Sequence, residues 1–120
     1  MRWPPSLQQE YQKQAGQHGL TSRPDIVVHE PFDPKRHCAR TEGNVAVIEL
    51  KLRATAAEAL ADFRSLRSML DVLRYPLGVF VNIDAAVTHA ELVPQDVRGR
   101  IACFAVMLAD DGPQIVEQRA

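Results

Sequence analysis

Long hydrophobic runs are missing from this sequence, and their absence excludes the simplest class of membrane protein. No apolar stretch among the 120 residues approaches the roughly 20 positions that a membrane-spanning helix needs. Residues 1–5 also lack the apolar core of a signal peptide. We therefore expect a cytoplasmic protein that has no membrane partner.

Cysteine and net positive charge are scarce as well. The two cysteines, Cys38 and Cys103, have no metal-ligand spacing, which favours free thiols over a disulfide. The net charge is −1, so any binding of nucleic acid must use a local basic patch. The apolar share of 46%, without repeats or low-complexity tracts, predicts a single small domain over residues 1–120.

Lysine is the third scarcity, with three lysines against eleven arginines, yet one of the three stands in the most apolar segment. The length and β-branched residues of this segment, residues 45–52, predict a buried strand. Charged side chains are rarely buried unless they are paired, and here Glu49 and Lys51 share one strand face with Val45 and Val47. We interpret the charged pair as part of a site. The opposite face takes Ala46, Ile48, Leu50 and Leu52.

Two elements are expected before this strand. Three consecutive β-branched residues at 26–28 predict a strand, which places Asp25 at its start, and residues 31–44 form a long hairpin-like loop. For residues 6–16 the pattern allows a short helix or, equally well, an edge strand centred on residues 9–12.

One clear helix follows the apolar strand. Thr55 and Glu58 form a capping box at its beginning, and Tyr75-Pro76 ends it at about Arg74. Between these limits apolar residues recur at steps of three and four positions, which predicts one buried helix face. These residues are Leu60, Phe63, Leu66, Leu70 and Leu73.

Three more strands are expected after the helix. They are predicted over residues 77–83, 101–108 and 114–117, with a turn at 110–112 and a polar, broken segment at 84–100. A strand, a helix of nearly twenty residues and another strand predict a right-handed crossover between parallel strands. The fold class is therefore α/β, with a mixed β-sheet and one principal crossover helix.

The chemistry of the predicted site depends on two carboxylates and one ammonium group. Asp25 and Glu49 lie on strands that a hairpin-like loop allows to pair. Two carboxylates brought together repel unless a cation lies between them, and oxygen ligands of this kind suit Mg²⁺ or Mn²⁺. Lys51 can steady an attacking water or the charge that develops on a phosphoryl oxygen. Such an assembly is typical of metal-assisted phosphodiester hydrolysis.

The segments RPDIVV at 23–28 and VIELK at 47–51 together resemble the PD-(D/E)XK nuclease superfamily. The resemblance covers roughly residues 23–83 and implies a restriction-endonuclease-like fold and a Mg²⁺- or Mn²⁺-dependent nuclease acting on DNA. It implies that Asp25 and Glu49 bind the metal and that Lys51 assists the attacking water. Family members usually begin with a helix that often bears another acid, and Glu10 is the early acid available here.

Several basic residues are candidates for contact with DNA, although a solvated surface explains them equally well. They are Arg23, Lys35, Arg36, Arg40 and Arg53. A homodimer is compatible with the sequence. The alternative to a nuclease is a non-catalytic binding or scaffolding domain that keeps the same fold without turnover.

Overall fold

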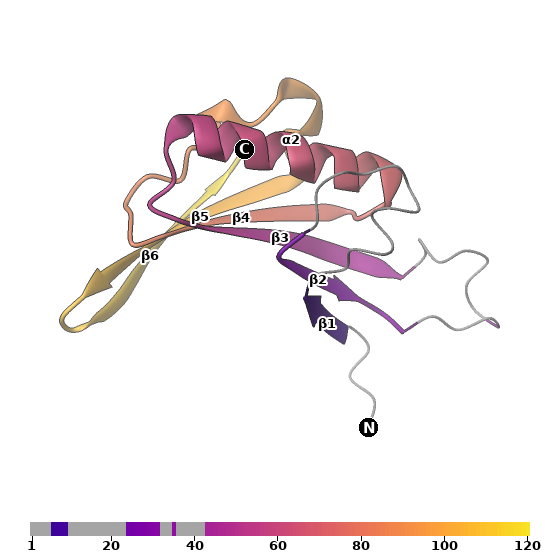
Figure 1. Ribbon diagram of the computed structural model, residues 1–120, viewed down its shortest axis with the longest axis horizontal. Coiled ribbons are helices and arrows are strands. Elements are labelled where there is room, and N and C mark those ends of the chain that lie inside the picture. The colour runs from indigo at the N-terminus through magenta and orange to yellow at the C-terminus, as the bar shows by residue number, and fades with distance from the viewer. Residues whose placement is uncertain (1–5, 10–23, 32–34, 36–42) are drawn as a thin grey trace.

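The computed structural model describes the backbone of residues 6–9 together with residues 24–31, 35 and 43–120. These residues form a six-stranded sheet, one α-helix and two short 3₁₀-helices (Figure 1). The strands are β1 (Ser6–Gln9), β2 (Ile26–His29), β3 (Asn44–Leu52), β4 (Leu77–Ile83), β5 (Ile101–Ala109) and β6 (Gly112–Arg119). The helices are α2 (Ala56–Val72), η1 (Ala90–Leu92) and η2 (Gln95–Val97).

The sheet is mixed, and its spatial order follows the order of the chain. Strands β3, β4 and β5 run parallel, whereas the pairs β1–β2, β2–β3 and β5–β6 are antiparallel. The predicted α/β class and the parallel pairing of β3 with β4 are therefore confirmed. At the start of the chain, β1 is an edge strand over Ser6–Gln9, while residues 10–16 lie outside the described residues. Segment 84–100, predicted as polar and broken, connects β4 to β5 and contains both 3₁₀-helices.

The capping box predicted at the start of α2 is present. The Thr55 Oγ1 atom accepts from the Glu58 backbone N–H at 3.1 Å, and the Glu58 carboxylate accepts from the Thr55 backbone N–H at 2.9 Å. Phe63 packs edge-on against Phe80 of β4 with ring centroids 5.0 Å apart, and both residues are fully buried. The buried stripe begins at Ala59, where the sequence pattern had favoured Leu60, because the helix turns its smaller side chain toward the sheet.

The end of α2 is fixed by groups from other parts of the chain. Arg74 adopts a left-handed conformation with φ of 63°, one residue after the Leu73 C-cap, which breaks the helix before Pro76. The Asn44 side chain, at the beginning of β3, donates to the Leu73 carbonyl at 2.5 Å. Asn44, the first residue of β3, therefore caps the C-terminal end of α2.

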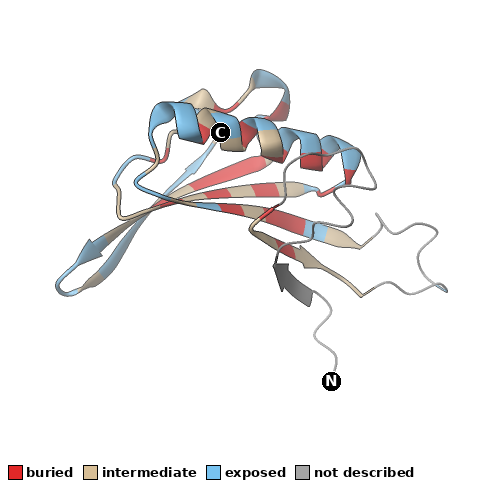
Figure 2. Ribbon diagram, viewed as in Figure 1, coloured by how far each residue is buried: buried red, intermediate tan, exposed pale blue. Residues whose placement is uncertain are grey.

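All the described helices lie on one side of the sheet (Figure 1). Figure 2 shows the buried residues along the central strands and on the side of α2 that faces them. Within the described residues, no helix is long and apolar enough to cross a membrane. The hydrophobic core is thus the layer between α2 and strands β3, β4 and β5.

Replacing Thr55 with alanine tests the capping box. We expect Thr55→Ala to lower the free energy of unfolding by about 1 kcal/mol, because the first turn loses its side-chain acceptor. Urea denaturation followed by circular dichroism measures the change. Ser68→Ala is the matched control, since the Ser68 hydroxyl only donates back to the Arg64 carbonyl within the helix and alanine is a better helix former. Equal losses in the two variants would contradict the capping role.

Candidate active site

Asp25 immediately precedes β2 and lies opposite Glu49 of the neighbouring antiparallel strand β3. The register of β2 and β3 pairs Ile26 with Ile48, so the next residues outward, Asp25 and Glu49, project on the same side of the sheet. The Asp25 Oδ2 atom accepts from the Leu50 backbone N–H at 2.8 Å, which fixes this carboxylate against β3. A side-chain hydrogen bond also joins Asp25 to Glu49. The fold thus brings the two predicted metal ligands into contact.

Burial governs the charge of this carboxyl pair. Glu49 is only 7% exposed. Its burial raises the pKa of the Glu49 carboxyl to about 9, the negative charges of Asp25 and Asp62 act in the same direction, and Lys51 opposes them. At neutral pH Glu49 therefore holds a proton, which satisfies the hydrogen bond between the two carboxyl groups.

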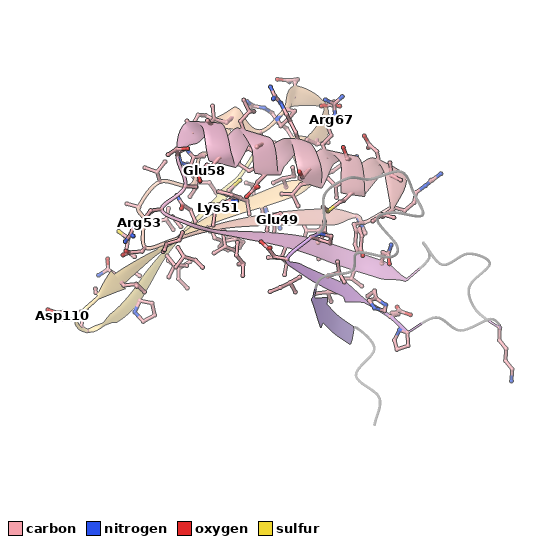
Figure 3. All side chains as sticks on the ribbon, in the orientation of Figure 1. Glu49, Lys51, Arg53, Glu58, Arg67 and Asp110 are labelled. Atoms are coloured by element: carbon pink, nitrogen blue, oxygen red, sulfur yellow. The ribbon has the colours of Figure 1, made fainter. Side chains whose placement is uncertain are left out.

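Lys51 lies on the same face of β3 and reaches toward α2 (Figure 3). Its ammonium Nζ is 3.5 Å from the Asp62 Oδ2 atom, with side-chain exposures of 35% for Lys51 and 15% for Asp62. The lysine therefore stands at the rim of the site, where one side of its ammonium group meets the protein and the other meets solvent. A substrate oxygen can approach that solvent side.

Asp62 is the residue that our sequence prediction missed. It lies three positions after buried Ala59 and four before buried Leu66, so α2 turns it toward the sheet. Its Oδ2 atom is buried and has no hydrogen-bond partner among the described residues. Burial raises the pKa of the Asp62 carboxyl, and the Lys51 ammonium lowers it. The sequence did contain a signal, because Asp62 occupies a position three or four residues from apolar residues that face the sheet.

Asn82 fixes the end of the strand that carries Lys51. It is 1% exposed and lies beside Lys51 in the register of β3 and β4. Its Oδ1 atom accepts from the Ala54 backbone N–H at 2.7 Å, and its Nδ2 group donates to the Val87 carbonyl at 2.8 Å. The Asn82 side chain thus holds together β4, the segment that leaves β3 and the loop that follows β4.

The carboxyl pair has the oxygen chemistry that Mg²⁺ or Mn²⁺ requires. Both metals accept protein carboxylates together with water and substrate phosphate, so two protein ligands are enough for a substrate-assisted site. Among the described residues, however, no group of three or more His, Cys, Asp or Glu side chains could hold a metal ion. Within the part of the chain that the structure describes, Asp25 and Glu49 are therefore the carboxyl groups that would hold a metal.

The other predicted site residues are placed less centrally. The Arg53 guanidinium group binds the Asp84 carboxylate at 2.7 Å and its side chain is 66% exposed, two residues beyond Lys51. Lys35 is exposed between β2 and β3. Four predicted residues lie outside the described residues, namely Glu10, Arg23, Arg36 and Arg40.

Comparison with known proteins does not identify a relative. No protein-family model matches the chain, and neither the curated proteins nor the solved structures include a significant match.

Proposed function

We propose that the chain is a Mg²⁺- or Mn²⁺-dependent nuclease that hydrolyses phosphodiester bonds in DNA on a restriction-endonuclease-like fold. The observation that carries the proposal is the contact between Asp25 and Glu49 beneath Lys51 on one face of the sheet. The motif resemblance supports it independently, because the same three residues match the pattern Asp, then Glu-x-Lys. DNA is the proposed partner.

The roles follow from the position and charge of each group. Asp25 and Glu49 would hold the cation, which supplies a polarised phosphoryl oxygen and a more acidic bound water. Glu49 must release its proton for this, and the backbone N–H of Leu50 keeps the Asp25 carboxylate in place meanwhile. Lys51 would place its positive charge beside the attacking water and the phosphoryl oxygen. Asp62 would position the Lys51 ammonium through the ion pair between them.

A specific observation also favours the second candidate, a non-catalytic binding or scaffolding domain. The described residues supply two carboxyl groups and no third ligand, and Glu49 is stable in its neutral form. A Glu49 that stays protonated, with Lys51 held by Asp62, would serve stability alone. The two functions therefore differ in whether a cation displaces the proton of Glu49.

Metal titration and cleavage assays together test the proposal. The purified chain should bind Mg²⁺ or Mn²⁺ by calorimetry with release of a proton, and it should nick or cut supercoiled, linear or single-stranded DNA. Asp25→Asn keeps an acceptor for the Leu50 N–H but removes the charge, so we expect metal affinity to fall by roughly tenfold or more and cleavage to fall with it. A wild-type chain that binds neither metal and cuts no DNA form would favour the scaffold.

A substitution of Asp62 tests its positioning role. We expect Asp62→Asn to reduce cleavage by roughly tenfold while metal affinity is kept, because the Lys51 ammonium loses its charged partner. The pH dependence of cleavage should shift as well, since removing a negative charge changes the titration of the neighbouring Glu49. Asp71→Asn is the control on the same helix, where Asp71 pairs with Arg100 at 3.6 Å on the surface. Unchanged cleavage in Asp62→Asn would exclude the positioning role.

A further inference from the structure

The face of the sheet opposite α2 is lined by apolar side chains from the four central strands, β2 to β5, and from the edge strand β6. Cross-strand pairs place them in rows, such as Leu52, Ile83, Val106 and Ile115 from β3 to β6. We call this surface the open face. It consists of Ile26, Ile48, Leu50, Leu52, Val79, Val81, Ile83, Phe104, Val106, Leu108 and Ile115.

No described helix covers the open face, because α2 and both 3₁₀-helices lie on the other side (Figure 1). Large apolar side chains remain exposed there, with Leu52 at 58%, Leu108 at 66% and Ile115 at 65%. Figure 3 shows that side chains on the side away from α2 consist mostly of carbon. An antiparallel sheet face that meets water usually carries polar residues, whereas the face of β3, β4 and β5 that points away from α2 carries apolar ones.

The size and charge of the open face fit a second copy of the chain. Strands about 4.8 Å apart with a rise of about 3.3 Å per residue give the five strands β2 to β6 a face of roughly 600 Å². This is the upper limit for an apolar patch on a monomer and close to the roughly 800 Å² that each partner buries in a standard interface. The charged residues in these rows, Glu117 and Arg119 on β6, have opposite signs and cancel. A face without net charge does not repel its own copy.

We propose that the chain forms a two-fold homodimer in which the open faces of two copies pack against each other. Two sheets pack face to face at about 10 Å, with apolar side chains interdigitating between them. A two-fold interface uses the same patch on both copies, so its chemistry must complement itself, as an apolar face does. Glu49 and Lys51 project from the other side of β3, so the dimer leaves both candidate sites open to solvent.

The oligomeric state of the full chain tests this proposal without any activity assay. Sedimentation equilibrium of the wild type at roughly 1 to 100 µM should give twice the chain mass of 13.4 kDa. Leu52→Glu and Ile115→Glu each place a charge in the interface twice, once for each copy. We expect either variant to weaken dimerisation by at least 100-fold and to sediment as a folded monomer.

Val87→Glu is the matched control, because Val87 is an exposed apolar residue at 52% in the loop after β4 and is not part of the open face. It should remain dimeric. Far-ultraviolet circular dichroism must show that each variant keeps its secondary structure. Because Leu52→Glu and Ile115→Glu are made separately, misfolding of one still leaves the other as a test. A wild type that is folded and monomeric at every concentration would overturn the proposal. The open face would then be covered by another segment of the chain or by a different partner. Variants that stay dimeric would overturn it equally.

Discussion

Lys51→Ala should reduce DNA cleavage by about two orders of magnitude in a chain that still binds Mg²⁺. In the proposed mechanism the substitution removes the ammonium beside the reacting phosphate, and this is the scale expected for the loss of one electrostatic donor. Both carboxyl groups stay in place, since Asp25 is anchored by the Leu50 N–H and does not depend on the lysine. Single-turnover cleavage of saturated complexes and calorimetric titration of the metal separate the two effects.

Melting temperature must be measured beside activity, because Lys51 also influences the buried acids around it. Its charge lowers the pKa of both Glu49 and Asp62, so its loss favours their neutral forms. Lost cleavage with little change in melting supports the nuclease. If Lys51→Ala lowers the melting temperature and the wild type cleaves no DNA, the result supports the scaffold. Arg67→Ala removes a positive charge on the other side of α2, where Arg67 pairs with Asp96 at 2.8 Å, and should leave cleavage unchanged (Figure 3).

The sequence was sufficient for those parts of the fold that local chemistry determines. β-branched residues marked β2 and β3, and the capping box located the beginning of α2 to the residue. The alternation of side chains along β3 also placed Glu49 and Lys51 on the same face. The shared face of Asp25 and Glu49 required one more inference, the antiparallel pairing of β2 with β3 through the loop between them.

The rest depends on tertiary contacts that one segment cannot reveal. Asp62 lies near Lys51 only because α2 packs across β3, and a helical acid beside leucines looks like a solvated residue in the sequence. The rotation of α2 that buries Ala59 in place of Leu60 is likewise set by the sheet beneath it. β6 extends to Gly112–Arg119, beyond the predicted 114–117, because ladder pairing with β5 recruits polar residues that have low strand propensity of their own.

The pH dependence of stability should expose the protonated carboxyl of Glu49. In the absence of metal, the pKa of Glu49 rises from 4.5 to about 9 on folding, so between these values the folded state binds one more proton than the unfolded state. The stabilisation is complete below the unfolded pKa and is lost as the pH rises through the folded one. The free energy of unfolding should therefore fall steadily as the pH rises through this range.

Glu49→Gln keeps the size and hydrogen-bonding capacity of the neutral acid but cannot ionise, so we expect its stability to change far less between about pH 5 and about pH 9. Urea denaturation in the presence of a chelator measures both profiles. The range ends at pH 9 because burial raises the pKa of Cys103 from 9.0 to about 11, which adds a separate loss above that pH. Glu58→Gln is the control substitution. Hydrogen bonds with Thr55 lower the pKa of Glu58, so its ionisation changes the free energy of unfolding only at acid pH.

On the proposed metal site, saturating Mg²⁺ should then reverse the loss in the wild type, because a cation that takes the place of the Glu49 proton and binds only the folded state stabilises that state. The stabilisation by Mg²⁺ should grow as the pH rises, and Glu49→Gln should show almost none of it. This measurement requires no substrate, so it tests the metal site even if the DNA that the chain acts on is not the one assayed. Parallel profiles for the wild type and Glu49→Gln would show that Glu49 is ionised in the folded chain and would remove the basis for a proton-to-metal exchange at this site.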